Sequence, residues 1–197
     1  MKYLSKVDKT LSRLIKKIGP ITLEPNTKKN PYEALFSSVV YQQLTGKAAA
    51  TILQRVLDLY PKKKFPKPEE LLKTPDKKLR AAGLSNAKML ALQDIARKTM
   101  DGLVPTKRAI IKMDDEEIIT RLTQIRGVGQ WTVEMLLIFN LGRPDVFPAT
   151  DYGVRKGFAL TYGQSDLPNF KELHAYSERW RPFRTTAAWY LWRALEL

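Results

Sequence analysis

The chain has 197 residues, of which 44% are hydrophobic and 27% charged, and its formal net charge is +14. This composition is typical of one globular domain or two small lobes, and the positive excess favours a polyanionic partner, nucleic acid before a membrane surface. The absence of cysteine excludes disulfides, thiolate zinc sites, iron–sulfur clusters and cysteine nucleophiles. A single histidine, His174, argues against metal catalysis and Ser-His-Asp chemistry. No apolar run reaches the roughly 18 residues of a membrane span, so we expect an intracellular protein.

The first half of the chain predicts helices joined by short turns. Apolar residues recur at three- and four-residue steps over 4–18, which predicts one amphipathic helix ended by Gly19-Pro20. Asn30-Pro31 has the pattern of a helix cap followed by a first helical residue. Further helices are expected over residues 47–60, 68–73, 75–82 and 86–100.

The second half is also helical. Residues 103–113 are interpreted as a linker that borders a cleft between two lobes, and the acidic run 114–117 suits a helix start because of the helix dipole. Val/Ile/Thr alternation is missing, so no strand is predicted. The fold class is therefore all-α, with two helical lobes. The expected division places 31–110 in one lobe and 1–30 plus 111–197 in the other.

Residues 122–155 concentrate the features that suggest binding and chemistry. They predict a helix, a tight turn at Arg126-Gly127-Val128-Gly129, a second helix, a proline-bracketed loop and then Asp151 at a further helix start. Glycines allow another backbone to approach closely, and N–H groups at a helix N-terminus suit a phosphate. We expect a carboxylate at Asp151 to lie in the positive field of a helix start, which favours its negative charge. For the turn alone, a ligand-free helix–helix connection is the alternative.

A second motif, Tyr41-Gln42-Gln43-Leu44-Thr45-Gly46, interrupts two helices. An apolar side chain on an exposed turn beside glutamines can intercalate into DNA while the amides touch base edges. For Leu44 the alternative is ordinary burial in the core. The lysine clusters at 62–64, 77–78 and 107–108 are interpreted as solvated faces, and His174 as a helix-surface residue.

Separated motifs occur in a fixed order: VVYQQLTGKAA at 39–49, LTQIRGVGQWTVEML at 122–136, DVFPATDYGV at 145–154 and ERWRPFRTTAAWYLW at 178–192. This order resembles the helix-hairpin-helix DNA glycosylase superfamily, and within it the type II DNA-3-methyladenine glycosylases. The resemblance implies two helical lobes that clamp duplex DNA and flip a base into the cleft between them. It also leads us to expect no N-terminal β-rich lobe of the kind that some bacterial relatives carry.

The resemblance further implies roles for individual residues. Asp151 matches the catalytic carboxylate. Gln43 and Leu44 match the minor-groove contact and the wedge that fills the space left by the flipped nucleotide. The hairpin would hold a DNA phosphate through Arg126, Gly127, Val128 and Gly129. A monovalent cation would be held there by the backbone carbonyls of Ile125 and Val128, and no other cofactor is expected.

Trp131 stands where the bifunctional members carry a lysine nucleophile. Without that lysine no Schiff base forms, so a monofunctional hydrolase without AP lyase activity is expected. Trp131 and Trp192 match aromatic residues of the base pocket, where a π-face attracts the positive charge of an alkylated purine. Plain core packing is the alternative for both. Met135 replaces a pocket tyrosine, which puts the breadth of substrates in doubt.

The leading hypothesis is therefore the first step of base excision repair, hydrolysis of the N-glycosidic bond of 3-methyladenine or 7-methylguanine in duplex DNA. Asp151 would stabilise the developing oxocarbenium charge or deprotonate the attacking water, two roles that the sequence leaves open. One alternative is a non-catalytic helix-hairpin-helix module that binds duplex DNA. Another is a glycosylase for deaminated or oxidised bases. We expect a monomer without membrane contact, cytoplasmic and nucleoid-associated, or nuclear in a eukaryote.

Overall fold

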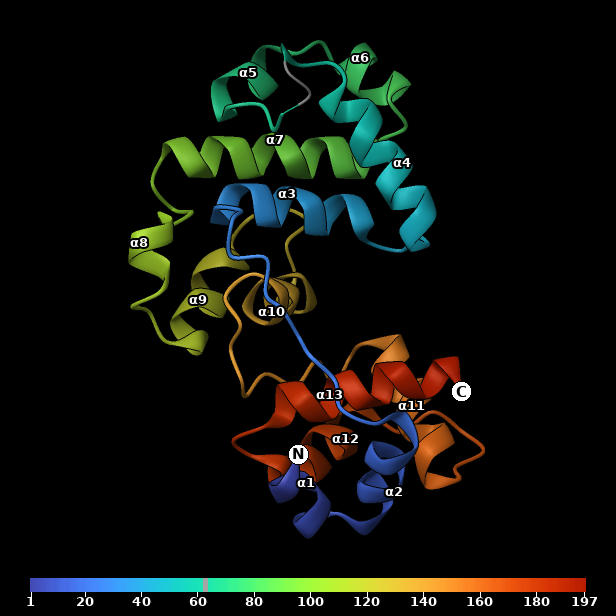
Figure 1. Cartoon of the computed structure of the whole chain (residues 1–197). Coiled ribbons are helices and arrows are strands. Elements are labelled where there is room, and N and C mark those ends of the chain that lie inside the picture. Colours follow the sequence, from blue (N-terminus) through green and yellow to red (C-terminus); the bar gives the residue numbers. More distant parts are fainter. Residues whose placement is uncertain (62–63) are drawn as a thin grey trace. The chain divides into compact units, whose positions relative to one another are not determined.

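The computed structural model describes residues 1–61 and 64–197 (Figure 1). Within these ranges the secondary structure consists of thirteen α-helices and short 3₁₀ turns without a strand, which confirms the predicted all-α class. No helix in the described ranges is long and apolar enough to cross a membrane. Lys62 and Lys63, which belong to the first predicted lysine cluster, lie outside the described residues.

The chain forms two compact units, one made of Met1–Pro25 and Leu137–Leu197 and the other of Asn26–Leu136. The chain passes from one unit to the other twice, and the second passage, between Leu136 and Leu137, lies inside the helix α10 (Gln130–Phe139). The division expected from the sequence differs, since it assigned 111–136 to the lobe with both chain ends. The reason is that the hairpin packs on its own unit: the backbone N–H of Arg126 donates to Asp94 at 2.8 Å.

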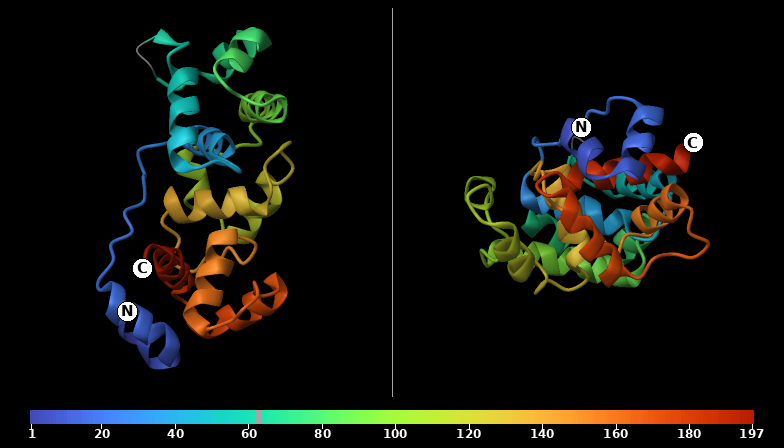
Figure 2. Two further views of the ribbon diagram at one scale, coloured as in Figure 1. Left: turned by 90° about the vertical axis from the view of Figure 1, so that its right-hand side faces the viewer. Right: turned by 90° about the horizontal axis from the view of Figure 1, so that it is seen from below.

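The central unit, residues 26–136, is built on two neighbouring helices, α3 (Pro31–Tyr41) and α7 (Asn86–Met100), which lie side by side (Figures 1 and 2). The start of α3 is fixed by a capping box, because the Asn30 side chain accepts from the Glu33 N–H while the Glu33 side chain accepts from the Asn30 N–H. Around this pair lie α4 (Gly46–Leu57), α5 (Pro68–Lys73) and α6 (Asp76–Ala81).

The prediction that residues 103–113 form an irregular linker is wrong. The segment contains a short helix, α8 (Lys107–Ile110), whose N-cap Thr106 accepts from the Ala109 N–H at 3.3 Å. The guanidinium of Arg121, on α9 (Asp115–Leu122), donates to the carbonyls of Leu103 and Gly102 at 2.6 and 2.7 Å. These bonds hold the segment against α9, and the cap gives a hydrogen-bond partner to an N–H group of the first turn of α8. The helix is too short to produce a recognisable apolar pattern in the sequence.

The other unit brings together the two ends of the chain. Its helices are α1 (Lys2–Val7), α2 (Lys9–Ile18), α11 (Tyr152–Tyr162), α12 (Phe170–Ser177) and α13 (Arg184–Arg193), with 3₁₀ turns η2 (Glu178–Trp180) and η3 (Ala194–Glu196). The core is apolar and aromatic, with fully buried Leu4 and Leu11 from the N-terminal segment and Trp180 and Tyr190 from the C-terminal one. The expected surface position of His174, on α12, is confirmed by its exposure.

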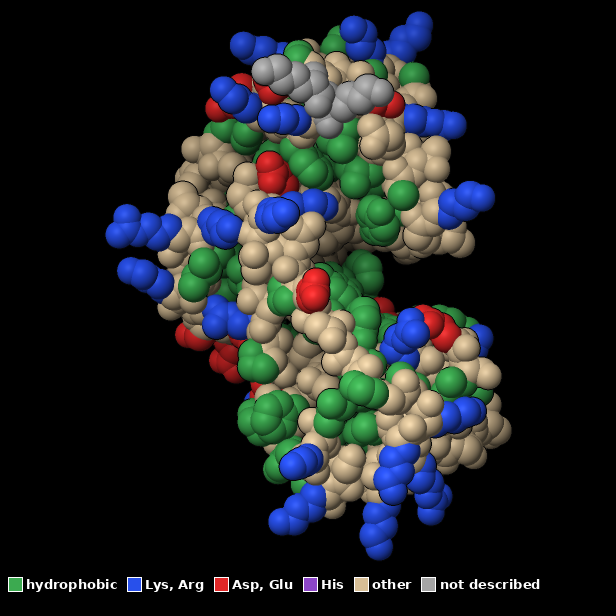
Figure 3. All heavy atoms as spheres, viewed as in Figure 1, with side chains coloured by type: hydrophobic (Ala, Val, Ile, Leu, Met, Phe, Trp, Pro, Cys, Tyr) green, Lys and Arg blue, Asp and Glu red, His purple; other side chains and the backbone are tan. Residues whose placement is uncertain are grey.

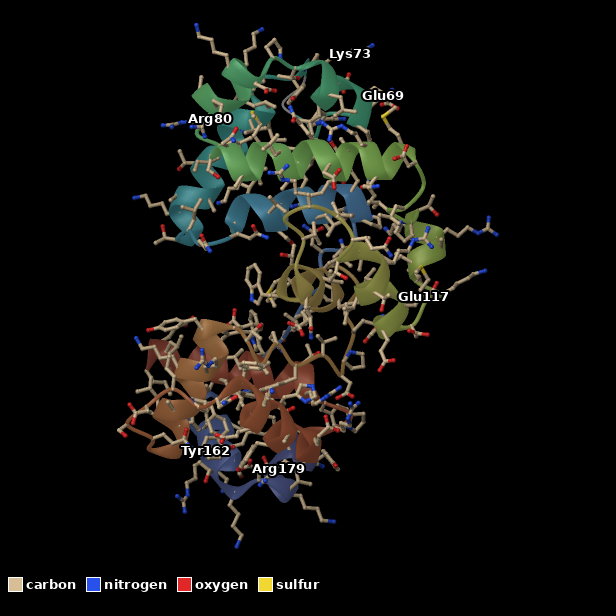
Figure 4. The ribbon with its side chains drawn as sticks, turned by 180° about the vertical axis from the view of Figure 1, so that it is seen from behind. Glu69, Lys73, Arg80, Glu117, Tyr162 and Arg179 are labelled. Atoms are coloured by element: carbon tan, nitrogen blue, oxygen red, sulfur yellow. The ribbon has the colours of Figure 1, made fainter. Side chains whose placement is uncertain are left out.

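A buried carboxylate divides the N-terminal segment, so the single helix predicted over 4–18 is wrong. Asp8 is extended (φ −143°, ψ 106°) and separates α1 from α2. One oxygen caps α2 by accepting from the Leu11 N–H at 2.9 Å. The other accepts from the side chains of Tyr162, Trp180 and Tyr176 at 2.6, 3.1 and 3.2 Å. Tyr162 accordingly lies against the N-terminal helices in Figure 4.

These contacts set the ionisation of Asp8. Burial by itself would raise its pKa, but the donors from Leu11, Tyr162, Trp180 and Tyr176 outweigh burial and hold the pKa below its ordinary value. Burial, and after it the hydrogen bond to Asp8, raises the pKa of the Tyr162 hydroxyl above its ordinary value. The ionised carboxylate therefore acts as the polar joint between the two ends of the chain.

We expect the Asp8 joint to make stability fall in acid. Because the pKa of Asp8 is lower in the folded than in the unfolded chain, its contribution is present above the unfolded pKa and is lost as the pH falls through the folded pKa. Between about pH 5 and about pH 2, the free energy of unfolding in urea should fall less steeply for Asp8→Asn than for the wild type. At neutral pH the variant should be less stable by about 2 kcal/mol. Parallel pH curves would contradict this assignment.

A glycine determines how closely α11 and α13 approach. A Cβ at Gly157 would lie 1.9 Å from the carbonyl oxygen of Leu191. Gly157→Ala should therefore lower the free energy of unfolding by about 3 kcal/mol, because two backbones must separate. The matched control is Gly46→Ala, where a Cβ meets nothing within 4 Å, and which should change stability by less than about 1 kcal/mol. Equal effects of the two substitutions in urea unfolding would show that α11 has room to move.

Candidate active site

Asp151 occupies the N-cap of α11, with extended backbone angles (φ −65°, ψ 126°). Its Oδ1 accepts from the Val154 N–H at 2.8 Å, and its carbonyl accepts from the Arg155 N–H at 3.0 Å. The expected placement of this carboxylate at a helix start is confirmed. Capping satisfies a helix N–H that has no partner inside the helix and leaves the carboxylate half-exposed at the end of its loop.

Trp192, on α13, contacts the same oxygen. Its indole Nε1 donates to Asp151 Oδ1 at 2.7 Å, a short charge-assisted hydrogen bond. Two donors from two helices therefore converge on one carboxylate oxygen and fix the orientation of the group. Of the four residues predicted for catalysis and the base pocket, these two are brought into direct contact.

A glycine makes this contact possible, and the sequence interpretation did not single it out. A Cβ at Gly153 would lie 2.8 Å from Cδ1 of Trp192 and 3.1 Å from Oδ1 of Asp151. Gly153 and Gly157 lie four residues apart and hence on one face of α11, the face that packs on α13. Their spacing after Asp151 was the signal in the sequence for a close helix–helix contact.

The indole of Trp192 is held by two further rings. Phe139, at the end of α10, lies 5.6 Å from it between ring centroids, at 31° between planes. Trp189 lies 6.1 Å from it, edge to face, and 5.9 Å from Phe139. These are favourable aromatic geometries. Phe139 and Trp189 were not predicted as site residues, although Trp189 and Trp192 are three residues apart on one helix face.

The loop that leads to Asp151 is anchored by the first turn of α13. The Arg184 side chain is buried and donates to both carboxylate oxygens of Asp145, at 2.9 and 3.1 Å, and to the Asp145 carbonyl at 2.8 Å. The Thr185 hydroxyl accepts from the Val146 N–H at 2.9 Å and donates to the Arg143 carbonyl at 2.7 Å. Arg184 thus has a structural role, because it binds the loop to α13. One helix, α13, holds both the loop and the carboxylate that follows it.

The expected wedge turn lies between α3 and α4 in the central unit. Gln43 and Leu44 are both exposed, Leu44 to 39%. The alternative that Leu44 belongs to the core is therefore wrong. Gln43 has φ +55°, a left-handed conformation that is uncommon for a residue other than glycine. The turn thus presents an amide and an apolar side chain to solvent, the two groups that the wedge hypothesis needs.

The expected hairpin connects α9 to α10. Gly127 has φ +74°, and a Cβ there would lie 2.7 Å from Cβ of Ala91 on α7. The side chains of Ile125 and Val128 are buried and anchor the turn. Asp94 accepts from the Arg126 N–H, whereas Gly127 and Gly129 are exposed. Phosphate binding by Arg126, Gly127, Val128 and Gly129 stays a prediction, in which Arg126 would take part through its exposed side chain.

The other two predicted pocket residues lie on successive turns of α10. Trp131 is half-buried and Met135 is 9% exposed. They belong to the central unit, whereas Asp151 and Trp192 belong to the other one. The structure defines each pair within its own unit, and a base pocket formed by all four stays a prediction.

Comparison with known proteins places these features in one family. The HhH-GPD superfamily of base excision DNA repair proteins matches residues 36–182. DNA-3-methyladenine glycosylase 1 of Schizosaccharomyces pombe is 43% identical over 198 residues, 99% of this chain and 86% of the relative. DNA-3-methyladenine glycosylase 2 of Escherichia coli is 27% identical over 159 residues, 80% of this chain and 52% of the relative.

Solved structures agree. The fold is similar to that of 3-methyladenine DNA glycosylase of Schizosaccharomyces pombe in complex with abasic DNA, with a TM-score of 0.93, 43% identity, and coverage of 99% of this chain and 95% of that one. DNA-3-methyladenine glycosidase from Bacillus halodurans gives a TM-score of 0.82 at 35% identity, over 98% and 87% of the two chains. The family match spans the wedge turn, the hairpin and Asp151, and a relative 43% identical covers nearly the whole chain. The chain therefore belongs to the HhH-GPD superfamily of base excision DNA repair proteins, as its motifs indicated.

Proposed function

We propose that Asp151 is the catalytic carboxylate of a monofunctional DNA glycosylase that hydrolyses the N-glycosidic bond of alkylated purines in duplex DNA. The observation that carries this proposal is the carboxylate at the start of α11, oriented by Trp192 and Val154. The names of the relatives, DNA-3-methyladenine glycosylases, support the class of substrate. Membership in a family of base excision DNA repair proteins supports placing this hydrolysis as the first step of base excision repair.

The chemistry needs little from the protein beyond one negative charge. The alkylated purine of the substrate is cationic and takes the electron pair of its bond to C1′, so it departs as a neutral base and leaves the positive charge on the sugar. Water then adds to C1′ and releases a proton, which completes the hydrolysis. An ionised carboxylate beside that carbon stabilises the charge. Since Oδ1 of Asp151 already accepts two hydrogen bonds, we favour this electrostatic role over removal of a proton by the same oxygen.

The residue at position 131 restricts the reaction to hydrolysis. Trp131 has no amine, so the second strand-cleaving step through a Schiff base is not available to it. Trp131 and Met135 on α10 would offer apolar and aromatic surface to a flipped, positively charged ring, and Trp192 is proposed as a further aromatic residue of the pocket. Selectivity would come from this attraction and from the lower cost of unstacking a damaged base.

DNA binding is supported by charge and by two exposed turns. The net charge is +14, and Figure 3 shows Lys and Arg side chains spread over the face of each unit that it displays. Leu44 would serve as the wedge with Gln43 in the minor groove, while the hairpin holds a phosphate. The carbonyls of Ile125 and Val128 are oxygen donors of the kind that alkali cations accept, and would hold a monovalent cation there. One chain acting as a monomer suffices for this arrangement.

The first test is single-turnover release of free base from duplex DNA methylated at N3 of adenine and N7 of guanine. Asp151→Asn keeps an oxygen that can accept from Val154 and Trp192 but removes the charge. We expect the variant to lose at least about 100-fold in rate while binding duplex DNA within about 3-fold of the wild type. A wild type that binds duplex DNA but releases no base would instead favour the binding-module hypothesis or a different lesion.

The second test concerns the orientation of Asp151. Trp192→Phe removes the indole N–H and keeps an aromatic face, so we expect the single-turnover rate to fall by about 10-fold with a smaller change in substrate affinity. Trp189→Phe is the matched control, because Trp189 packs on the same rings but is not the residue that donates to Asp151. Equal losses in the two variants would show that ring packing, rather than the hydrogen bond, matters.

A further inference from the structure

One face of α7 supports both exposed turns of the central unit. Lys88, Ala91 and Asp94 follow one another at three-residue steps and so lie along one side of the helix. Ala91 packs so closely against Gly127 that a Cβ at Gly127 would lie 2.7 Å from Cβ of Ala91. Asp94 accepts from the Arg126 N–H. The hairpin is therefore seated on the middle of α7.

The first residue of this row holds the wedge turn. The ammonium of Lys88 donates to the carbonyls of Val40 and Gln42 at 2.7 and 2.8 Å. These two carbonyls belong to the last turn of α3 and to the residue just after it, where a helix leaves its carbonyls without internal partners. Burial lowers the pKa of Lys88, in keeping with an ammonium partly withdrawn from water against these oxygens.

Gln42 joins the two turns directly. Its side-chain Nε2 donates to the hydroxyl of Thr132 at 2.8 Å and to the carbonyl of Gly127 at 3.0 Å, so both of its amide protons are used. Its partners lie 90 and 85 residues further along the chain. The wedge turn and the hairpin are therefore connected twice, once through α7 and once through this amide.

The backbone of Gln43, the residue that follows Gln42, has the conformation that these hydrogen bonds hold in place. Gln43 has φ +55°, and a residue other than glycine keeps such a backbone only where its surroundings determine it. The bonds to the backbone and side chain of Gln42 act immediately before this residue. They fix the point from which the chain turns outward to expose Leu44.

We propose that Gln42 is a positioning residue that, with Lys88, locks the wedge turn in register with the phosphate-binding hairpin. The inference rests on the proposed function, in which Leu44 enters the base stack while the hairpin holds the backbone. Flipping a paired base requires unpairing and unstacking it. An inserted side chain can stabilise the flipped state only if its own turn keeps a fixed conformation. Losing the lock should slow the flipping of a paired base and spare both phosphate binding and the chemistry at Asp151.

The test compares two duplexes that differ only opposite the lesion. In one, 7-methylguanine pairs with cytosine. In the other it faces an abasic site, so no pair has to be broken. For Gln42→Met, which keeps the shape of the side chain without its donors, single-turnover release should fall by about 10-fold or more from the paired duplex. Release from the unpaired duplex should stay within about 3-fold of the wild type.

Three further variants complete the design. Lys88→Met and Leu44→Ala should show the same selective loss, because they remove the second support and the wedge itself. Gln54→Met is the matched control: Gln54 lies on α4 of the same unit, and its amide donates at 3.0 Å to the exposed Asp58, the C-cap of the same helix, rather than to either turn. It should leave release from both duplexes unchanged.

Each outcome decides the proposal. Selective loss with the paired duplex, together with an unchanged dependence of DNA affinity on salt, supports it. Wild-type rates in Gln42→Met with the paired duplex overturn it, as does an equal loss with both duplexes, which would show a general disturbance of the fold. A wild type that releases no base from either duplex overturns the proposed function, and with it the inference.

Discussion

The site depends on one hydrogen bond, from the indole of Trp192 to the carboxylate of Asp151. That bond forms only because α11 and α13 approach until the backbone of one meets the backbone of the other, which Gly153 and Gly157 permit. The rest of the unit maintains this approach. Arg184, at the start of α13, fixes the loop before Asp151, so a single helix determines both the path of the loop and the direction in which its last carboxylate points.

The central unit solves a comparable problem with a different helix. Its two exposed turns are far apart in the sequence, and α7 carries both on one face while Gln42 connects them across it. In each unit, then, the predicted site residues lie on or beside an irregular segment, and a neighbouring helix holds that segment through hydrogen bonds to its backbone. Functional loops on a rigid support are the usual arrangement, because the support removes the conformational freedom that binding would otherwise have to restrict.

Two carboxylates in the unit made of Met1–Pro25 and Leu137–Leu197 serve the same purpose. Asp8 joins the N-terminal helices to α11 and to the η2 turn through donors that satisfy its charge. Asp145 does so for the loop before Asp151. Asp8 is buried, and a buried carboxylate is costly unless it is paired or bonded, whereas Asp145 is partly buried. Both are bonded to residues distant in the sequence. Each therefore favours one arrangement of the chain over others that would bury similar apolar area.

The sequence by itself determined the all-α class, most helix positions, the family and the placement of Asp151 at a helix start. Those follow from local signals: apolar period, capping residues, glycine turns and ordered motifs. It did not determine the break at Asp8, the helix α8, or the contacts of Gly153, Phe139 and Gln42. The apolar period continues past Asp8, and only its partners, up to 172 residues away, explain why the helix stops there. Likewise, Gln42 is one of two adjacent glutamines, and only the folded chain shows which amide meets the hairpin and which faces solvent. A contact between two segments far apart in the sequence produces no repeating residue pattern in either segment. Only the tertiary structure therefore decided these contacts.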